Sequence, residues 1–578
     1  MRGWSEIAER VAGTARTSEK TALLARYLAE LPDQELRPAA IFLSGRPFPE
    51  VDQRSLGLGW ATMAAAVSHL ADAPAGALGA AYDRSSDLGT AVADVLSLRP
   101  VQPDPEAAPA LSDVAEAFSA IEAAPGAAAK GAVFAALLTR CDPLAAKFVV
   151  KILTGDLRIG LREGLLEAAI AQAFDRPQPL VSRAGMLTGD MGETAVLARA
   201  GLLGEARLRL LHPLRFMLAS PAEDAAEILT RLGPQVWVED KYDGIRAQLH
   251  RRGSEVRLYS REMHDISDQF PEIVAASEDL AWDGILDGEI LAYADGRVLP
   301  FLTLQARLGR KDPGTEVLAD VPVIYVAFDL LAAGPRSDLN GAEGLQPLLE
   351  VPLAQRRIRL EALDLPLVTD GGRFALSHLV TADSVEALDR FFGEARARRN
   401  EGLMVKDPES VYSPGRRGLG WLKMKRALAT IDCLVVGVEV GHGKRHAVLS
   451  DYTFAVRDEA TERLVTIGKA YTGLTDAEIA DMTAWFEAHT VRRLGRFRQV
   501  EPTVVIEVAF DVIQRSTRHE SGFALRFPRI VRIRTDKGPA QIDTLAAVER
   551  LYRELQNGAE YLVTADARRI PRRPAEIA

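Results

Sequence analysis

The chain contains very little cysteine: Cys141 and Cys433 are the only two among 578 residues. Two cysteines so far apart exclude a disulfide framework and a four-cysteine zinc module, and we expect both to be buried thiols. No run of about eighteen uncharged apolar residues is present. The start, Met1-Arg2-Gly3-Trp4, does not resemble a basic-then-apolar leader. We therefore expect a cytoplasmic protein without membrane attachment.

Positive charge is also in short supply. The 70 lysine and arginine residues are outnumbered by 80 aspartate and glutamate residues, which gives a net charge of −10. This excludes a uniformly positive surface, so any contact with nucleic acid must use local patches. Residues 411–426 carry basic but no acidic side chains, and in residues 515–537 basic side chains far outnumber Glu520 and Asp536. Taken alone, each patch is explained equally well as a solvated face.

The length and composition predict several globular domains. Hydrophobic residues make up 47% and charged residues 26% of the chain, as in ordinary folded proteins. At about 150 residues per domain, three to four domains are expected. Apolar residues at helical spacing, such as those between Leu23 and Leu31, predict an all-α domain over residues 1–212. The Pro/Ala-rich stretch Pro100–Pro109 is predicted to be a loop inside it.

Short β-rich runs begin near Pro213. They predict an α+β domain over residues 213–426 and a small β-barrel of the OB type over residues 427–578. Thr475 and Glu478 form a capping-box pattern that predicts a helix between the barrel strands. The predicted strands of the α+β domain are residues 235–238, 256–259, 285–293, 323–330 and 402–405. Those of the barrel are residues 434–440, 452–456, 464–470, 504–512 and 530–533.

Lys241 is the most informative residue. It lies in Glu239-Asp240-Lys241-Tyr242-Asp243-Gly244-Ile245-Arg246, directly after a strand-like run and before an Asp-Gly turn signal. A lysine amine becomes a nucleophile when neighbouring cations or a metal ion lower its pKa. Alone, the segment is better explained as a surface hairpin with solvated charges.

Six further clusters follow Lys241 in a fixed order. They are residues 260–261 (Ser-Arg), 286–290 (Leu-Asp-Gly-Glu-Ile), 325–330 (Tyr-Val-Ala-Phe-Asp-Leu), 400–406 (Asn-Glu-Gly-Leu-Met-Val-Lys), 421–425 (Trp-Leu-Lys-Met-Lys) and 525–537. The ordered set resembles the covalent nucleotidyltransferase superfamily, and in detail the ATP-dependent DNA ligases. The resemblance covers about residues 213–537. Residues 154–160 and 187–192 are more loosely similar to the DNA-binding domain of the larger ligases.

The resemblance implies covalent chemistry with ATP. Lys241 would attack the α-phosphate to form lysyl-AMP, with Lys423 and Lys425 against that phosphate. Asp243 would order the turn or serve a later proton transfer. Phe328 would stack on the adenine, and Arg534 and Lys537 would act from the barrel domain while it covers the nucleotide. The residues implied in nucleotide binding are Glu239, Arg246, Arg261, Glu289, Phe328, Lys423, Lys425, Arg534 and Lys537.

A divalent metal ion, Mg²⁺ or Mn²⁺, is implied as well. Carboxylate oxygens, together with retained waters and substrate phosphates, are what Mg²⁺ prefers. Glu401 and Glu289 are the implied ligands, and Glu289 would also bind the ribose. Alone, Glu289 is equally well explained as a turn carboxylate after Asp287-Gly288.

Nicked double-stranded DNA is the implied partner. Phe301 and Phe527 are candidates for an aromatic pair that packs beside the nick, although both are equally well explained as core residues. Arg246 and Arg261 would contact the ribose or the phosphate at the nick. Salt-sensitive contacts to DNA phosphates from the helical domain are expected as well. The candidates for them are Lys147, Lys151, Arg158 and Arg162, each of which also fits an ordinary surface charge.

Some features depart from the resemblance. Glu262 follows Ser260-Arg261 where the family more often has an uncharged or basic residue, and the stretch 332–350 is longer than usual. His442, His446 and His519 do not form a metal-ligand spacing. An RNA ligase, an RNA-capping guanylyltransferase and a non-catalytic nick-binding protein stay open as alternatives, whereas the few cysteines disfavour an NAD-dependent ligase. We expect a monomer, and the sequence assigns no protein partner.

Overall fold

The computed structural model describes residues 1–104, 107–299, 301–310, 312–336, 344–398, 400–415, 417–425, 429–441, 445, 448–556, 560–563 and 569–572. The chain divides into two compact units. The first unit is Met1–Leu218, Gly244–Leu376 and Glu409–Gly418, and the second is Ala219–Asp243, Ser377–Pro408 and Leu419–Ala578. Both units draw on the segment 213–426, so the domain boundaries at residues 212 and 426 stay predictions. His442, His446, Arg416 and Arg426 lie outside the described residues.

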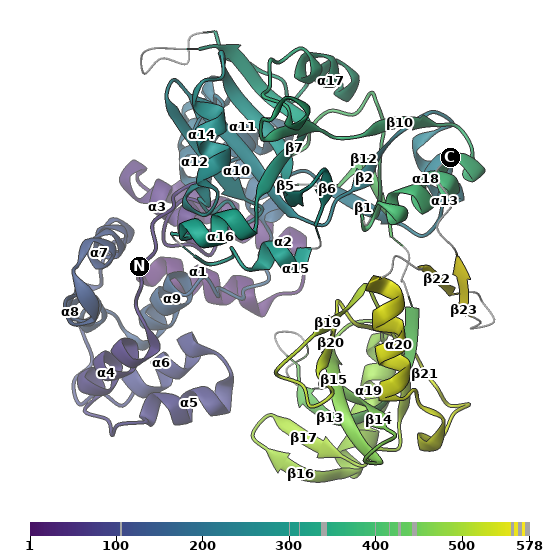
Figure 1. The fold of residues 1–578 in the computed structure, drawn as a ribbon. Helices are drawn as coiled ribbons and strands as arrows, with labels where there is room; N and C mark the ends of the chain where they lie inside the picture. The colour runs from purple at the N-terminus through teal and green to yellow at the C-terminus, as the bar shows by residue number, and fades with distance from the viewer. Residues whose placement is uncertain are drawn as a thin grey trace. The chain divides into compact units, whose positions relative to one another are not determined.

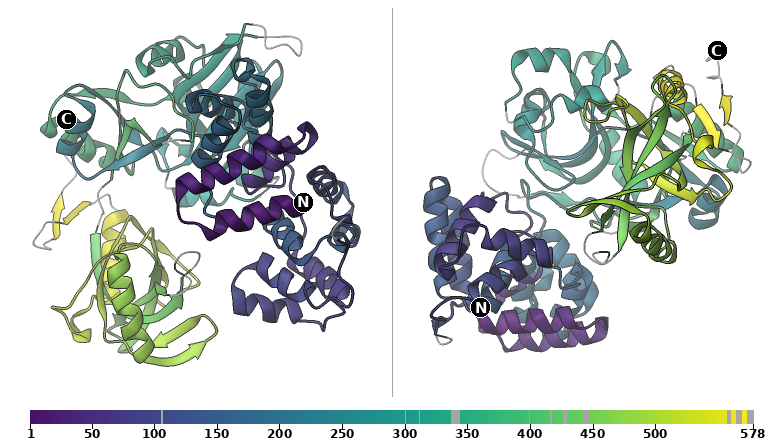
Figure 2. Two further views of the ribbon diagram at one scale, coloured as in Figure 1. Left: turned by 180° about the vertical axis from the view of Figure 1, so that it is seen from behind. Right: turned by 90° about the horizontal axis from the view of Figure 1, so that it is seen from below.

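The N-terminal part of the first unit is helical, as the apolar spacing predicts (Figure 1 and Figure 2). Its core contains an aromatic cluster in which Trp4 lies edge-on to Phe42 and Phe148, with ring centroids 6.5 and 5.7 Å away. The described part of Pro100–Pro109 contains no α-helix, which confirms the predicted loop. The helices are α1 (Arg2–Gly13), α2 (Thr17–Glu30), α3 (Asp33–Leu43), α4 (Trp60–Ala71), α5 (Ala77–Ser85), α6 (Leu88–Leu96), α7 (Leu111–Ala123), α8 (Gly126–Thr139), α9 (Pro143–Leu153), α10 (Glu163–Ala173), α11 (Gln178–Thr188) and α12 (Met191–Ala200).

The rest of the first unit is built on a mainly antiparallel sheet with the strand order β4-β3-β5-β7-β8, in which β6 pairs with β5 and β9 with β7. Strand β3 (Ile245–Arg252) is not among the strands predicted from the sequence, because its charged residues hide the alternation. Leu249 enters the apolar core, whereas Arg246, Gln248 and His250 lie on the opposite face. The other elements are β4 (Glu255–Ser260), α14 (Pro271–Glu278), β5 (Trp282–Ala294), β6 (Arg297–Val298), α15 (Phe301–Gln305), α16 (Thr315–Asp320), β7 (Val323–Pro335), β8 (Gln346–Pro347), α17 (Leu353–Glu361) and β9 (Phe374–Leu376).

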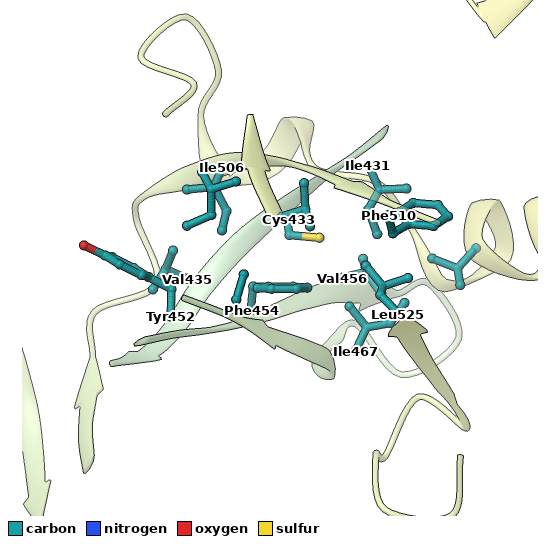
Figure 3. Packing of buried hydrophobic residues seen from close by; sticks show 14 of the residues in the cluster. Ile431, Cys433, Val435, Tyr452, Phe454, Val456, Ile467, Ile506, Phe510 and Leu525 are labelled. Atoms are coloured by element: carbon teal, nitrogen blue, oxygen red, sulfur yellow. The ribbon is translucent and has the colours of Figure 1, made fainter. Parts of the chain in front are cut away.

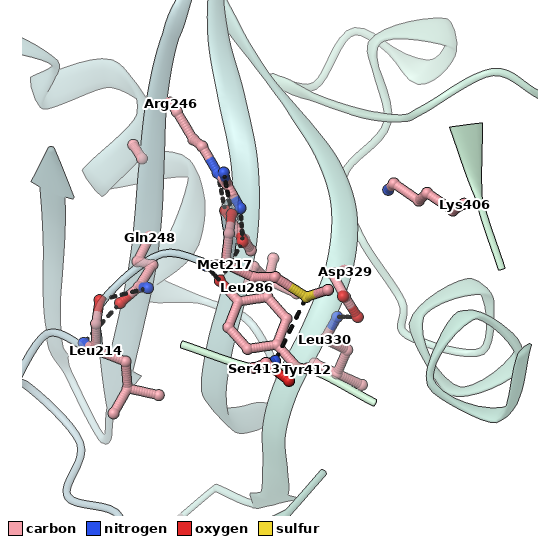
Figure 4. A network of polar contacts seen from close by, with 12 residues as sticks. Leu214, Met217, Arg246, Gln248, Leu286, Asp329, Leu330, Lys406, Tyr412 and Ser413 are labelled. Carbon is pink, nitrogen blue, oxygen red and sulfur yellow. Dashed lines mark hydrogen bonds and ion pairs between the residues drawn. The ribbon is translucent and has the colours of Figure 1, made fainter. Parts of the chain in front are cut away.

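The polar face of β3 is covered by the segment 211–217, which follows the helical part in the chain. The Gln248 amide accepts from the Leu214 nitrogen at 2.9 Å and donates to the Leu214 oxygen at 2.8 Å (Figure 4). The Leu211 nitrogen donates to Nδ1 of His250 at 3.2 Å. Burial lowers the pKa of His250 to about 3, so the ring is neutral and accepts this bond. The side chains of Gln248 and His250 therefore form hydrogen bonds to the backbone of the segment 211–217. The buried polar groups on this face of β3 are paired in this way.

The second unit contains a five-stranded sheet with the order β1-β12-β11-β2-β10. Strand β2 (Val236–Lys241) is antiparallel to both of its neighbours. Its side chains Val236 and Val238 pack against Ile228 and Phe392, which come from two helices. The other elements are β1 (Leu218–Ala222), α13 (Ala225–Leu232), β10 (Leu379–Ala382), α18 (Val385–Ala397), β11 (Gly402–Lys406) and β12 (Arg417–Met424).

The C-terminal region is a strand-rich domain of the predicted OB type. Figure 3 shows its apolar core, where Phe454 and Ile467 pack with Phe510 and the thiol of Cys433. Cys141 and Cys433 are both free and buried, as predicted. The elements are β13 (Ala429–Val440), β14 (Leu449–Asp458), β15 (Arg463–Ala470), α19 (Asp476–Ala488), β16 (Thr490–Leu494), β17 (Phe497–Val500), β18 (Val505–Phe510), β19 (Val512–Arg515), β20 (Phe523–Arg526), β21 (Arg529–Ile533), α20 (Leu545–Gln556), β22 (Glu560–Val563) and β23 (Arg569–Arg572).

The predicted barrel strands fall within β13, β14, β15, β18 and β21, but the predicted strand 504–512 spans two strands, because β18 ends at Phe510 and β19 begins at Val512. The capping box is confirmed: the Glu478 nitrogen donates to Oγ1 of Thr475 at 3.3 Å, and the Thr475 nitrogen donates to the Glu478 carboxylate at 2.7 Å. Among the described residues, no helix combines the length and the apolar character needed to cross a bilayer.

Candidate active site

Lys241 ends β2 beside a carboxylate that it shares with a second lysine. Its Nζ donates to Oε2 of Glu401 at 2.5 Å, and Lys425 forms an ion pair with the same oxygen. Strand pairing fixes this arrangement, because Gly402 of β11 lies opposite Lys241 and the Glu401 nitrogen donates to the Lys241 carbonyl at 2.7 Å. The fold thus brings together three residues that the sequence analysis selected from separate clusters.

The two lysines give Glu401 an unusual acidity. Burial raises the pKa of its carboxyl group, but the charges of Lys241 and Lys425 outweigh burial and hold the pKa at about 2. Burial, and then the charge of Glu401, raise the pKa of the nearby Asp243. The site therefore contains one carboxylate that stays ionised and binds cations, and a second acid that is easier to protonate.

Lys423 lies on β12 opposite Met404 of β11 and is half-buried. Met424, between Lys423 and Lys425, is fully buried in the apolar core of the sheet. Because side chains alternate along an extended chain, Lys423 and Lys425 point to the other face. The two lysines therefore lie on the same face of the chain, and their contact with a nucleotide stays a prediction.

Glu239 lies on β2 two residues before Lys241. Its carboxylate is buried and accepts from Nζ of Lys406 at 2.5 Å. The Lys406 ammonium also lies 4.3 Å from the ring centroid of Trp421 on β12. Three neighbouring strands are therefore joined by one buried cation. The predicted contact of Glu239 with the nucleotide stays a prediction.

The first unit holds Arg246, Glu289 and Phe328 on one sheet. Arg246 lies opposite Glu289 across β3 and β5. Its guanidinium donates to both oxygens of Asp287, at 3.1 and 2.7 Å, and to the Met217 carbonyl at 2.8 Å (Figure 4). The guanidinium lies 5.4 Å from the centroid of the Phe328 ring. The side chain is therefore held in place by an ion pair and an aromatic contact.

Tyr412 completes this group. Its hydroxyl donates to Oδ2 of Asp287 at 2.6 Å and accepts from the Met217 nitrogen at 3.1 Å. Burial, and then the charge of Asp287, raise the pKa of Tyr412 well above its ordinary value, so the phenol stays protonated. The buried carboxylate of Asp287 therefore accepts hydrogen bonds from the charged Arg246 and from the neutral Tyr412. These bonds offset the cost of burying its charge.

The remaining candidates of the first unit differ in exposure. Arg261 follows the end of β4 and is exposed. Phe301 begins α15, is half-buried and packs against the apolar core of the sheet. Arg158 is exposed and has a left-handed backbone with φ of 48°, which is uncommon for a side chain with a Cβ. Its guanidinium donates to the Ser86 carbonyl at 3.3 Å, which steadies the loop that carries it.

The structure corrects the prediction for Lys151. We predicted a surface contact to DNA phosphate, but the side chain is 5% exposed and forms an ion pair with Asp87, which caps the N-terminus of α6. The ammonium therefore joins two helices inside the domain. Lys147 is more accessible, although it is paired with Glu9 at 2.7 Å. Arg162, at the start of α10, is exposed.

In the C-terminal domain, Arg534 and Lys537 share the carboxylate of Asp432. Arg534 donates to it at 3.0 Å and Lys537 at 2.5 Å. Arg534 is only 8% exposed and also donates to both oxygens of Asp536, at 2.8 and 2.7 Å. Phe527, by contrast, is 58% exposed, lies between β20 and β21 and has φ of 54°. It belongs to the surface and not to the core.

Several residues that organise the site carry little or no signal in the sequence. Asp287 and Lys406 lie inside the quoted clusters but received no role, because a cluster shows proximity in sequence and not which side chains pair. Tyr412 carries no signal beyond its place in the basic stretch 411–426. Asp432 had none, because its partners are about a hundred residues away.

Three parts of the chain match family descriptions. Residues 2–171 match "DNA ligase N terminus", residues 216–425 match "ATP dependent DNA ligase domain" and residues 445–537 match "ATP dependent DNA ligase C terminal region". The matches therefore include the Lys241 cluster and the Arg534 cluster.

Curated proteins are similar over nearly the whole chain. The "Probable DNA ligase" of Koribacter versatilis (strain Ellin345) is 46% identical over 563 residues, 95% of this chain and 96% of the relative. The "DNA ligase" of Methanopyrus kandleri is 36% identical over 562 residues, 95% of this chain and 98% of the relative. A "Probable DNA ligase" of Opitutus terrae is 43% identical over 94% of this chain, which spans 61% of that relative.

The solved structure named "Pmar-Lig_Pre." has a TM-score of 0.59 and 16% sequence identity, over 92% of this chain and 99% of that chain. At this identity the likeness concerns the fold alone.

Proposed function

The chain belongs to the ATP-dependent DNA ligases, and we propose that it joins nicked DNA through a covalent bond between Lys241 and AMP. The observation that supports this assignment of residues is that Lys241, at the end of β2, and Lys425 both form ion pairs with the carboxylate of Glu401. A lysine held there against a second cation is suited to attack a phosphate whose charge the site neutralises.

Joining takes three steps, each of which exchanges one phosphoryl bond for another. The lone pair of Lys241 Nζ forms a bond to the α-phosphorus of ATP, its proton leaves, and pyrophosphate departs. An oxygen of the 5′-phosphate at the nick then attacks the same phosphorus, and the P–N bond to Lys241 breaks. Finally the 3′-hydroxyl attacks the 5′-phosphate, loses its proton and releases AMP. Catalysis is therefore mainly positioning and charge neutralisation.

Lys423 and Lys425 are proposed to hold the α-phosphate. Lys425 reaches the same carboxylate oxygen as the nucleophile, so a phosphate close to Lys241 is also close to Lys425. Both cations would stabilise the negative charge that the phosphate oxygens carry in the transition state. Glu401 would offset the repulsion between the two ammonium groups while no phosphate is bound.

The family implies a divalent metal ion, and the donor chemistry of the site suits Mg²⁺ or Mn²⁺. Among the described residues, no group of three or more His, Cys, Asp and Glu side chains is placed to hold a metal by itself. Mg²⁺ commonly uses one or two carboxylates together with substrate phosphates. We propose Glu401 and Glu289 as those carboxylates. The ion would add positive charge next to the phosphates.

The first unit is proposed to bind the nucleoside and the nick. Phe328 would stack on adenine, and Glu289 would accept from the ribose. Arg246 is held between Asp287 and the Phe328 ring, and we propose that it steadies the adenine site and contacts the ribose or the phosphate at the nick. Glu239 and the exposed Arg261 complete the proposed nucleotide contacts.

Arg534 and Lys537 are proposed to act on the pyrophosphate in the first step alone. Lys537→Met is expected to lower the rate of adenylylation by about 100-fold, because a cation directed at the leaving group is lost. Sealing of a nick that already carries AMP should change little. Rapid-quench assays of the two reactions check this. An equal loss in both reactions would show that Lys537 acts on DNA or on folding instead.

DNA phosphates are proposed to bind the helical domain, and Phe527 is proposed to pack beside the nick. Arg158→Ala is expected to reduce the slope of log K against log salt for nicked DNA by about 1. Arg140→Ala, which removes an exposed arginine paired with Asp113, is the control and should leave the slope unchanged. Fluorescence anisotropy at graded salt measures both. Equal slopes for the two variants would remove Arg158 from the interface.

Intact-mass analysis tests the proposed chemistry directly. Purified protein, first freed of bound AMP with pyrophosphate, is incubated with a divalent metal and ATP, GTP or NAD in parallel. An adenylyl increment with ATP alone, located on Lys241 by peptide mapping and discharged by nicked duplex DNA, is expected. An increment with GTP would indicate a capping enzyme. An increment on another residue would refute the assignment of Lys241.

The alternatives from the sequence are not favoured. The matched domains are those of ATP-dependent DNA ligases, and the relatives that are similar over nearly their whole length are named DNA ligases. A pure nick-binding protein has no need of Lys241, Glu401 and Lys425 together. We propose that the enzyme works in the cytoplasm, at the nucleoid if the protein is bacterial or archaeal, and that it is a monomer.

A further inference from the structure

Asp240 precedes the nucleophile on β2 and points to the opposite face of the strand. Its carboxylate is buried and accepts three hydrogen bonds. Arg398 donates from Nε to Oδ2 and from Nη2 to Oδ1, both at 2.8 Å, and Nδ2 of Asn400 donates to Oδ2 at 2.9 Å. The fork from Arg398 is the bidentate geometry that fixes a planar guanidinium against a planar carboxylate.

Arg398 and Asn400 belong to the turn between α18 and β11, and Glu401 is the next residue. Backbone bonds tie the same turn on two further sides. The Asn400 nitrogen donates to the Ala395 carbonyl at 3.0 Å, and the Glu401 nitrogen donates to the Lys241 carbonyl at 2.7 Å. Nη1 of Arg396 donates to the Asn400 oxygen at 2.9 Å. The backbone that carries Glu401 is therefore fixed to β2, with Asp240 as the central acceptor.

This placement matters because glutamate has three rotatable side-chain bonds. A carboxylate on a loose turn would rarely stay within hydrogen-bond distance of a lysine on another strand, whereas a turn held by three charge-assisted bonds keeps it there. We propose that Asp240 is a positioning residue: through Arg398 and Asn400 it fixes the turn from which Glu401 reaches Lys241, Lys425 and the divalent ion. The proposal rests on the proposed roles of Lys241 and Glu401.

A buried ion pair with a structural role alone is the competing explanation, and the chain offers a matched control. Asp283 in the first unit is also a buried carboxylate, and it accepts from Nη1 of the fully buried Arg251 at 2.9 Å and from the Gly253 nitrogen at 2.9 Å. Asp283→Asn therefore removes a comparable buried charge outside the Lys241 site. Arg398→Lys provides a milder second variant, because its side chain is 41% exposed and lysine keeps the charge but loses the fork.

The test compares Asp240→Asn, Arg398→Lys and Asp283→Asn in the full-length protein. The first readout uses metal-free protein: hydrogen exchange of peptides spanning residues 396–406. Faster exchange at the Glu401 amide is expected in Asp240→Asn and Arg398→Lys, and unchanged exchange in Asp283→Asn. The second readout is adenylylation by ATP at graded Mg²⁺. The concentration of Mg²⁺ for half-maximal rate should rise about tenfold to a hundredfold in the first two variants, with the KM for ATP little changed.

Three outcomes are distinguishable. Faster exchange and a raised Mg²⁺ requirement in the two site variants support the proposal. Normal exchange at Glu401 with an unchanged Mg²⁺ profile in Arg398→Lys overturns it, even if Asp240→Asn fails to fold. If the wild-type protein forms no adduct at Lys241, the proposed function is refuted instead. Hydrogen exchange at the Glu401 amide then still decides whether Asp240 fixes the turn.

Discussion

Lys241→Ala protein is expected to acquire no adenylyl group from ATP and to seal no ordinary nick, yet to join a nick whose 5′-phosphate already carries AMP. The lysine nitrogen forms and breaks a bond in the first two steps only. Without it the first step has no nucleophile, whereas the third step needs only the 3′-hydroxyl and the adenylylated phosphate. Intact-mass analysis and gel assays with the two DNA substrates measure the two halves of this prediction.

The fold should survive this substitution, because Glu401 keeps its ion pair with Lys425. Lys469→Ala is the control: Lys469 is an exposed lysine of the C-terminal domain paired with Glu439 at 2.9 Å, and its loss should leave all three steps unchanged. Loss of joining on the pre-adenylylated nick in Lys241→Ala would mean that Lys241 also positions the DNA. Adenylylation of the Lys241→Ala protein would place the nucleophile elsewhere.

Arg356→Met is expected to destabilise the first unit by about 3–5 kcal/mol, because it leaves a buried carboxylate without its cation. Arg356 and Asp329 are both fully buried, and the guanidinium donates to the two carboxylate oxygens at 2.7 and 2.8 Å. Arg356 also donates to the carbonyls of Val351 and Ser410. Since Asp329 follows Phe328, the proposed adenine site should weaken together with the sheet. Hydrogen exchange of peptides from β5 and β7, with and without ATP, measures both effects.

Two variants separate the ion pair from side effects. Arg257→Met removes an arginine of the same unit whose partner Glu255 is solvated, so we expect a change below about 1 kcal/mol. The double variant Arg356→Met with Asp329→Asn should recover part of the loss, because no buried charge is then left alone. A double variant as unstable as the sum of the two single variants would show that the pair is not coupled.

The residues of the site could be predicted from the sequence where a motif combines a characteristic residue type with a predicted strand. Lys241, Glu401 and Lys425 were selected from three separate clusters, and strand pairing brings them to one point. The barrel strands were predictable in outline, because their apolar residues alternate. Strand β3 was missed, because its second face is polar and is covered by the segment 211–217 and not by water.

Lys151 and Asp432 show where sequence reasoning failed. A lysine on a helix looks the same whether its ammonium reaches solvent or an aspartate from another helix, and only packing shows that Lys151 is buried against Asp87. An isolated aspartate such as Asp432 has no pattern at all. Its importance comes from Arg534 and Lys537, which the fold brings to it from far along the chain.

The sequence by itself determined the family: Lys241, the lysine pair and the acids follow in the order of the ATP-dependent DNA ligases, in a chain with too little cysteine for a four-cysteine zinc module. The tertiary structure alone decided which charges are paired. The Asp240 fork and the buried Asp329–Arg356 pair join residues on different elements. Burial makes each unpaired charge costly, so the fold must pair them, and the pairing depends on distances in space that residue order does not encode.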